Sequence, residues 1–245
     1  MSQRTFYDDY PITSILLLLI AGFFALEMMG SQSHGAELAG GFDIYPVQPQ
    51  VALDLGSSAS WAIRDGEWWR LLASVFLHAG AIHLICNLSV LLYLGRVCEP
   101  RIASAKFFTV FVASGLGGSL ASFGWRVLRG TDGHSVGASG ALAGLIGMML
   151  IYAVKERDQD LRNDVVRWVV FLVLFSFFLP VDNLGHLGGF VVGCVLGLTV
   201  KQYTTSGEAR LWRIPAWICG GLVATSLGFA VWHHGSSNWD WNLVW

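Results

Sequence analysis

Long apolar runs separated by shorter polar segments dominate this sequence. Helical runs long enough to cross about 30 Å of hydrocarbon at about 1.5 Å per residue lie at roughly 11–29, 79–98, 105–126, 134–154, 165–181, 183–201 and 214–232. The interiors of these runs carry no lysine or arginine, each of which costs about 2.5–3.5 kcal/mol at mid-membrane on insertion scales. The pattern predicts an all-α, polytopic membrane bundle of seven transmembrane helices.

The composition supports a membrane protein and excludes several other classes. Of the 245 residues, 54% are hydrophobic and 13% are charged, whereas about 25% are charged in a typical soluble domain. No basic block suggests nucleic acid as a partner. The four cysteines lack metal-ligand spacing, and no HExxH arrangement is present. We therefore expect a single membrane domain that uses neither metal nor cofactor.

The distribution of cations along the chain predicts its orientation. Alternating the runs across the membrane places eleven lysine and arginine residues on the side of the N-terminus and four on the other, namely Arg64, Arg70, Arg126 and Arg129. Because cytoplasmic loops carry the excess of cations, residues 1–10 are expected in the cytoplasm and the C-terminus outside. The first run is interpreted as an uncleaved span, since no small-residue cleavage site follows it.

Two polar regions lie outside the membrane in this arrangement. The segment 30–78 combines Trp61, Trp68 and Trp69 with charged residues, which is typical of the membrane interface. A membrane-lying hairpin is favoured there over a small soluble cap. Residues 204–245 are interpreted as the seventh helix followed by a tryptophan-rich outer anchor.

The second, fourth and sixth runs carry unusual polar residues near their outer ends. His83 and Asn87 are four positions apart and share one helix face. Ser139 and His186 lie in the other two runs, within about two turns of the same side. Polar groups facing lipid would be costly, so each is expected to face the bundle interior.

Glycine spacing predicts that the fourth and sixth runs pack closely together. Small residues recur every four positions, at Gly140 and Gly144 in one run and at Gly185, Gly189, Gly193 and Gly197 in the other. Close packing would bring His186 within hydrogen-bond reach of Ser139, as a base beside a nucleophile. Glu27 and Glu99 lie toward opposite faces, so a Ser-His dyad is predicted rather than a triad.

A transition-state oxyanion also needs hydrogen-bond donors. His83, Asn87 and the backbone N–H of Ser139 are the candidates, with the N-terminal dipole of the fourth helix assisting. Each residue also has a simpler interpretation: Ser139 as a packing residue, His83 and Asn87 as an interhelical pair, and His186 as a core histidine. Their shared depth and the glycine repeats together favour catalysis.

Short motifs in these regions resemble one protease family across nearly all of the chain. They are Trp69-Arg70, His83 through Asn87, Gly137-Ala138-Ser139-Gly140 and Gly185-His186-Leu187-Gly188-Gly189. In this order they are similar to the WR, HxxxN, GxSG and (A/G)HxGG motifs of the rhomboid intramembrane serine proteases. Gly185 is a mild departure, because alanine is more common at that position.

The resemblance implies a six-helix catalytic core with a seventh helix added at the C-terminus. It implies Ser139 as nucleophile, His186 as general base, and His83 with Asn87 in the oxyanion site. It also implies that the first outer loop lies in the membrane and that the fifth helix, with residues 177–184, gates substrate entry.

The predicted function is that of an intramembrane serine endopeptidase that cleaves transmembrane or juxtamembrane segments of other membrane proteins. The expected partners are therefore transmembrane substrates and the lipid bilayer, in a bacterial inner membrane or a eukaryotic secretory membrane, with the bacterial membrane favoured. The main alternative is a non-proteolytic, rhomboid-like scaffold or chaperone for transmembrane clients. A small transporter is disfavoured, because ionisable residues do not continue along any run toward the inside.

Overall fold

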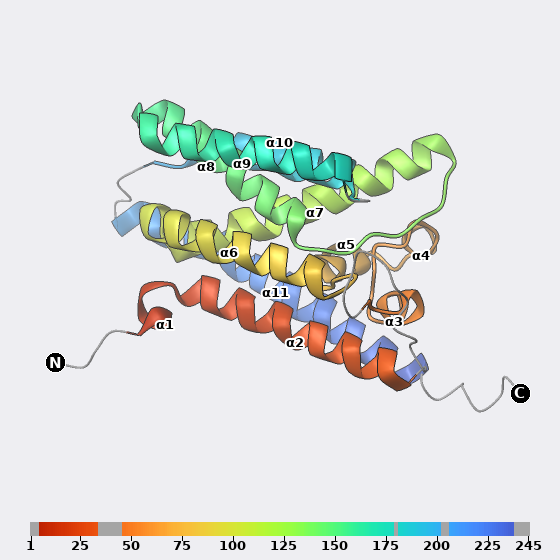
Figure 1. Ribbon diagram of the computed structural model, residues 1–245. Helices are drawn as coiled ribbons and strands as arrows, with labels where there is room; N and C mark the ends of the chain where they lie inside the picture. Colours follow the sequence, from red (N-terminus) through yellow and green to blue (C-terminus); the bar gives the residue numbers. More distant parts are fainter. Residues whose placement is uncertain (1–4, 34–45, 179–180, 202–205, 238–245) are drawn as a thin grey trace, which may run out of the picture.

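The computed structural model describes residues 5–33, 46–178, 181–201 and 206–237 (Figure 1). Its long helices are α2 (Pro11–Ser33), α6 (Ala81–Ile102), α7 (Ser104–Arg129), α8 (Ser139–Glu156), α9 (Gln159–Phe178), α10 (Asn183–Thr199) and α11 (Ser206–Ser237). The shorter elements are α1 (Phe6–Asp9), α3 (Pro49–Asp54), α4 (Ser60–Arg64), α5 (Arg70–Ala73) and the 3-10 helix η1 (Ser74–Phe76). Within these ranges the only extended pairing is one isolated bridge between Pro46 and Gly80.

Each predicted apolar run overlaps one long helix, and the prediction of an all-α membrane bundle is confirmed. In the described part of the chain, α2, α6, α7, α8 and α11 are long and apolar enough to cross a membrane. Helix α10 is apolar but has only 17 residues, and α9 opens with a polar turn that lowers its mean hydropathy. The chain is an integral, multi-pass membrane protein.

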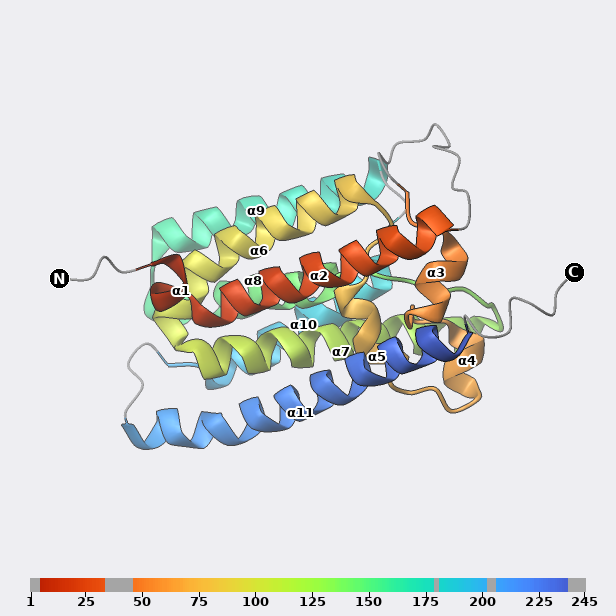
Figure 2. The same cartoon turned by 90° about the horizontal axis from the view of Figure 1, so that it is seen from below.

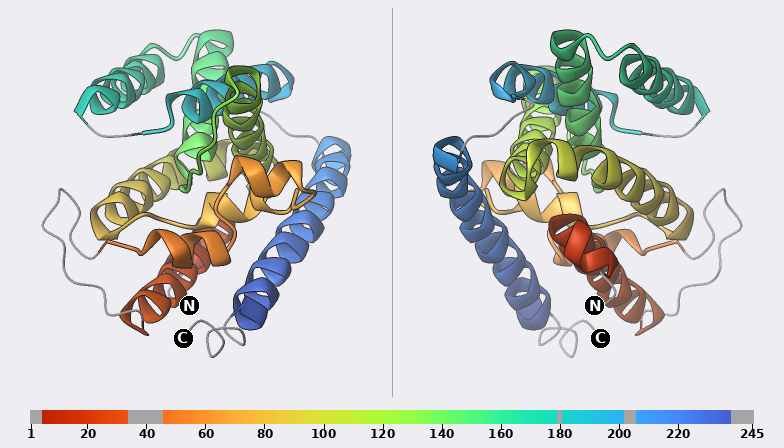
Figure 3. Two further views of the ribbon diagram at one scale, coloured as in Figure 1. Left: turned by 90° about the vertical axis from the view of Figure 1, so that its right-hand side faces the viewer. Right: turned by 90° about the vertical axis from the view of Figure 1, so that its left-hand side faces the viewer.

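Helices α7, α8 and α10 form the centre of the bundle. Helix α10 packs along both α7 and α8, while α9 packs on α8, α2 packs on α6, and α11 packs on α7. Figure 2 shows α9 and α11 at opposite edges of the bundle, and the end views in Figure 3 show α2 and α11 diverging from the central helices. Helices α8 and α10, which carry Ser139 and His186, are therefore neighbours in the core.

The predicted contact between these two helices is confirmed at the level of backbone atoms. A Cβ added to Gly189 would overlap the carbonyl group of Gly140, and one added to Gly193 would overlap that of Gly144. No side chain fits between the helices at these positions, so the glycines set the interhelical distance.

Helix α8 begins five residues later than the run at 134–154 predicted. The preceding segment, residues 131–138, has no regular secondary structure, and we call it the α7–α8 segment. Gly137 within it has a φ of +128°, which side chains other than glycine rarely adopt. Ser139 is consequently the first residue of α8.

Between α2 and α6 the chain forms a compact group of short helices, which we call the α2–α6 segment (residues 46–80). Arg70 is 5% exposed and donates hydrogen bonds to the Leu53 carbonyl and the Glu67 carboxylate. Trp69 stacks on Phe229 of α11 at a ring-centroid distance of 6.3 Å. The Arg70 hydrogen bonds lie within the α2–α6 segment, and the Trp69 ring joins that segment to α11. A membrane-lying position for the segment stays a prediction. The predicted tryptophans of the tail at 239–245 lie outside the described residues.

The two carboxylates that the sequence placed toward opposite faces join different parts of the bundle. Glu99 at the end of α6 accepts hydrogen bonds from the backbone and side chain of Thr13 and from the Ser104 hydroxyl. Glu27 near the end of α2 accepts from the backbone N–H of His78 at 3.1 Å. Both are almost fully buried. Glu99 joins the ends of α2, α6 and α7, whereas Glu27 joins α2 to the loop before α6.

Candidate active site

Ser139 lies where the α7–α8 segment enters helix α8. Helix geometry leaves the first N–H groups of α8 without intrahelical acceptors, and the positive end of the helix dipole lies at the same place. The Gly137 N–H donates to the Ser74 carbonyl at 2.9 Å, which fixes the path of the chain just before Ser139. The hydroxyl is thus held beside backbone donors that can face a developing negative charge.

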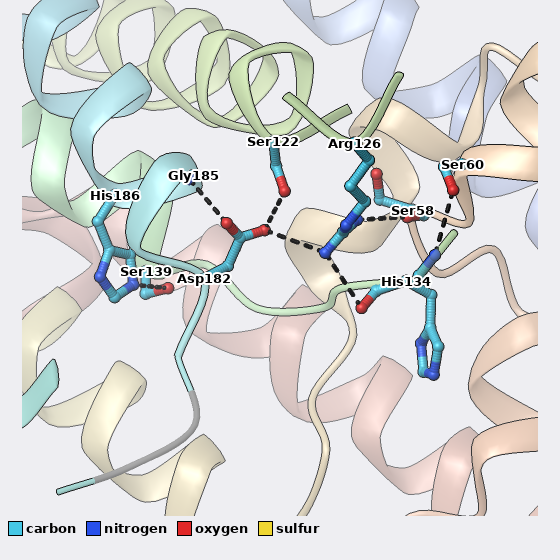
Figure 4. Close-up of polar contacts among 10 residues, drawn as sticks. Ser58, Ser60, Ser122, Arg126, His134, Ser139, Asp182, Gly185 and His186 are labelled. Carbon is cyan, nitrogen blue, oxygen red and sulfur yellow. Dashed lines mark hydrogen bonds and ion pairs between the residues drawn. The ribbon is translucent and has the colours of Figure 1, made fainter. Parts of the chain in front are cut away.

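His186 lies in the first turn of α10 and points toward Ser139. Asp182 caps this helix, because its carboxylate accepts from the Gly185 N–H and its carbonyl from the His186 N–H, both at 2.9 Å. The His186 Nε2 lies 2.6 Å from the Ser139 Oγ (Figure 4). The structure therefore brings together the two residues that the sequence suggested as nucleophile and base.

This geometry permits proton transfer from the serine hydroxyl to the imidazole. When His186 is neutral with its proton on Nδ1, Nε2 accepts the hydroxyl hydrogen bond and can take the proton as Oγ attacks a carbonyl carbon. The distance lies within the range expected for a nucleophile and its base.

A cavity opens over the two side chains and is lined mainly by small residues. Its lining consists of Ser74, Gly115, Gly118, Ser119, Ser135, Val136, Gly137, Ser139, Gly140, Asp182, Gly185 and His186. The glycines and serines leave room for a peptide backbone or a small side chain, and the hydroxyls offer hydrogen bonds to water or peptide.

His83 lies next to Gly137 of the α7–α8 segment, two residues before Ser139. A Cβ added to Gly137 would come within 2.8 Å of the His83 ring. The His83 Nδ1 accepts a long hydrogen bond of 3.4 Å from the Ala79 N–H. In the neutral ring this places the proton on Nε2, which makes that nitrogen a donor.

Asn87 lies one helical turn further along α6 than His83. Its side chain is 5% exposed, and its Nδ2 donates to the His83 carbonyl at 2.9 Å. An amide nitrogen has two hydrogens, so this bond leaves a second one to donate. Among the described residues, the buried Oδ1 of Asn87 has no hydrogen-bond partner. The structure thus places His83 beside the segment that leads to Ser139 and Asn87 one turn along the same face.

Sequence reasoning missed the polar network around Asp182, next to the dyad. The second carboxylate oxygen of Asp182 accepts from the Ser122 hydroxyl and lies 3.6 Å from a guanidinium nitrogen of Arg126. An aspartate directly before an apolar run is a recognisable helix cap. Its partners on α7 are more than fifty positions away in the sequence, and no local signal indicates them.

The α7–α8 segment is fastened to the α2–α6 segment by further polar contacts. Asp132 pairs with Arg64 at 2.5 Å and accepts from the Ser60 hydroxyl at 3.1 Å. These hydrogen bonds, that of Arg64 first, lower the pKa of the Asp132 carboxyl, so this carboxyl is ionised at neutral pH. Among the described residues, no group of three histidine, cysteine or acidic side chains is arranged to hold a metal ion.

Comparison with known proteins supplies relatives for most of the chain. Residues 65–203 match the family model of the Rhomboid domain. Rhomboid protease GluP of Bacillus subtilis is 32% identical over 73% of this chain, which spans 32% of that relative. RHOMBOID-like protein 5 of Arabidopsis thaliana is 35% identical over 66% of this chain, which spans 53% of it. The putative rhomboid protease YdcA of Bacillus subtilis is 31% identical over 81% of this chain, which spans 93% of it.

The first two relatives are considerably longer than the region that they share with this chain, whereas YdcA matches over nearly its whole length. The matched family model covers more than half of the sequence and includes α6 through α10, on which Ser139 and His186 lie. The chain belongs to the rhomboid family, whose members include intramembrane serine proteases.

Proposed function

We propose that this protein is an intramembrane serine endopeptidase in which Ser139 is the nucleophile and His186 the general base. The observation that carries the proposal is the 2.6 Å distance between the Ser139 Oγ and the His186 Nε2. Its substrates are other membrane proteins, cut in or next to a transmembrane segment. The protease names of the relatives agree with this reaction class.

The proposed reaction proceeds through an acyl-enzyme. His186 takes the hydroxyl proton as the Ser139 Oγ attacks the scissile carbonyl carbon, and a tetrahedral intermediate forms. The imidazolium then donates its proton to the leaving amine nitrogen as the peptide C–N bond breaks. A water molecule, deprotonated by the same imidazole, hydrolyses the ester and restores the serine.

The proposed oxyanion site consists of the Ser139 N–H, His83 and Asn87. The first turn of α8 contributes a backbone donor and the positive end of its dipole. His83 and Asn87 come from α6, and each carries an N–H group that could serve as a donor, on Nε2 and Nδ2 respectively. Such donors act strongly because the surrounding bundle limits the access of water.

Replacing Asn87 with alanine is expected to lower kcat by about 100- to 1000-fold, with a smaller change in KM, because one oxyanion donor is lost. The measurement is cleavage of a model transmembrane substrate in proteoliposomes. Ser89→Ala, an exposed position two residues away on α6, is the matched control and should behave as wild type. A fall below threefold for Asn87→Ala would remove this residue from the oxyanion site.

We propose that substrates enter between α6 and α9. Helix α9 packs on α8 along one edge of the bundle, and its Trp168 meets Tyr93 of α6 at a ring-centroid distance of 5.0 Å. Separating two helices that share one aromatic contact costs less free energy than separating two helices that pack closely along glycines. The predicted gating loop at 177–184 lies partly outside the described residues.

The proposed orientation places the dyad near the outer face. Ser139 and His186 both lie in the first turns of helices that run from outside to inside, and the excess of cations lies at the other ends. The N-terminus is then cytoplasmic and the C-terminus outside, in a bacterial inner membrane. Residues 11–203 form the proposed catalytic core, and α11 is added beside α7.

The proposed substrate preference is for transmembrane segments that unfold locally. A helix hides its scissile carbonyl in backbone hydrogen bonds, so small or helix-breaking residues near the cut should help cleavage. The test compares two substrates in proteoliposomes that differ only by a glycine pair replaced with leucine. Faster cleavage of the glycine form is expected; equal rates would contradict the preference, and no cleavage of either would contradict the proposed activity.

A further inference from the structure

We propose that Arg126 and Asp182 are positioning residues. They hold Ser139 and His186 in position relative to each other by joining the segments that lead into α8 and α10. This inference rests on the proposed protease function and adds to it a second connection between the two catalytic helices. The first connection is the glycine contact along α8 and α10. The second lies at their N-terminal ends, where Arg126 faces Asp182 (Figure 4).

The two carboxylate oxygens of Asp182 have different partners. Oδ1 accepts from the Gly185 N–H at 2.9 Å and caps the helix that carries His186. Oδ2 accepts from the Ser122 hydroxyl and faces Arg126, both on α7. A helix cap needs one oxygen only, so the second oxygen attaches the cap to another helix.

Arg126 extends this attachment to the two segments that border Ser139. The guanidinium nitrogen nearest Asp182, Nη2, also donates to the His134 carbonyl at 3.4 Å, and Nη1 donates to the Ser58 carbonyl at 3.3 Å. One side chain therefore contacts the cap of α10, the α7–α8 segment and the α2–α6 segment. Its five donors in a rigid planar group suit it to this bridging.

The connections from Arg126 to the dyad are short. His134 is five positions before Ser139, and Asp182 is four positions before His186. Between His134 and Ser139, the Ser135 carbonyl accepts from the Ser58 N–H and the Gly137 N–H donates to the Ser74 carbonyl, both at 2.9 Å. A shift of Arg126 or Asp182 would reach the two reacting groups through segments that are otherwise fixed.

The Arg126–Asp182 ion pair is shielded enough from solvent for its attraction to help hold the two segments together. The Arg126 side chain is 17% exposed and that of Asp182 is 23% exposed, so solvent screens them less than a surface pair. By contrast, Arg64 and Asp132 are 42% and 57% exposed. Arg64 also contacts the α7–α8 segment, through Asp132, so the Arg64 pair provides a matched control.

The test uses the full-length protein in proteoliposomes with a cleavable transmembrane substrate. Asp182→Asn keeps an oxygen to cap α10 but removes the charge that faces Arg126. Arg126→Gln removes the other charge, and Arg64→Gln is the control. We expect kcat to fall about tenfold in each single variant with KM unchanged, because misplacement of reacting groups slows chemistry rather than binding.

The double variant Asp182→Asn/Arg126→Gln should be no slower than the slower single variant, because the two residues act through one connection. Arg126→Lys retains the charge that faces Asp182 but not the planar group with its five donors, and should recover only part of the lost rate. Arg64→Gln should remain within twofold of wild type. Melting temperatures are measured for every variant, so that a loss of kcat well below the melting transition is separated from unfolding.

Several results would overturn the positioning role. These are wild-type kcat in both single variants, multiplied effects in the double variant, a change in KM alone, or an equal loss of kcat in Arg64→Gln. A loss of activity that only follows the loss of folded protein would assign the pair to stability instead. If the wild type neither cleaves the substrate nor reacts with a serine-directed fluorophosphonate, the proposed protease function fails, and the positioning role fails with it. If the wild type cleaves normally and the Arg126 and Asp182 variants are unaffected, only the positioning role fails.

Discussion

Replacing Ser139 with alanine is expected to abolish cleavage, with a loss of at least about 10⁴-fold in kcat. The change removes the Oγ that lies 2.6 Å from the His186 Nε2, so no nucleophile remains. Alanine is compatible with the first position of a helix, and the melting temperature should change little. The measurement is the release of a fluorescent fragment from a model transmembrane substrate by purified protein.

The same assay tests whether the two residues act as one unit. His186→Ala should cause a loss comparable to that of Ser139→Ala, and the double variant should be no worse than either single one. Thr199→Val, an exposed change at the other end of α10, is the control for altering this helix. Cleavage by Ser139→Ala at more than 1% of the wild-type rate would contradict a nucleophilic role.

The second large effect is expected at the contact between α8 and α10. Replacing Gly193 with valine places a Cβ where the Gly144 carbonyl group lies, and two backbones must separate to accommodate it. Overpacking typically costs about 1–3 kcal/mol, and this site should lie at the upper end because no flexible side chain can yield. At about 2–4 °C per kcal/mol for a chain of this size, we expect the melting temperature to fall by about 6–12 °C.

The rate of cleavage by Gly193→Val should also fall, by at least about 100-fold and even at temperatures below the melting transition. Separation of the helices moves His186 away from Ser139. Gly221→Val on α11 is the matched control, since a Cβ there meets nothing within 4 Å. Gly193→Ala should give an intermediate loss. Wild-type stability and cleavage in Gly193→Val would show that the glycine contact does not set the position of His186.

The sequence was sufficient to predict the helices and one interface between them. Apolar runs free of cations indicated the spans, because the cost of burying charge in lipid acts on every residue of a span. Glycines at Gly189 and Gly193 predicted a close contact, because a four-residue repeat of small side chains forms a continuous ridge on a helix. Both signals are local, and the structure confirms both.

The start of α8 and the network around Arg126 depend on contacts between distant residues. Residues 134–138 were included in the fourth predicted run, but in the structure they precede the helix. Hydrogen bonds from the Ser58 N–H to the Ser135 carbonyl and from the Gly137 N–H to the Ser74 carbonyl hold this segment outside it. Asp182 was recognisable as a helix cap from its place before an apolar run. Its pairing with Arg126 depends on how α7 and α10 pack, which no local pattern in either helix specifies.

Covalent labelling tests the central claim most directly, namely that Ser139 is a nucleophile activated by His186. The membrane-reconstituted wild type is treated with a serine-directed fluorophosphonate, and the modified peptide is identified by mass spectrometry. We predict one adduct, on the Ser139 Oγ, and its absence in His186→Ala. An adduct on a different serine, equal labelling of His186→Ala, or no adduct under conditions that label a known rhomboid protease would contradict the claim.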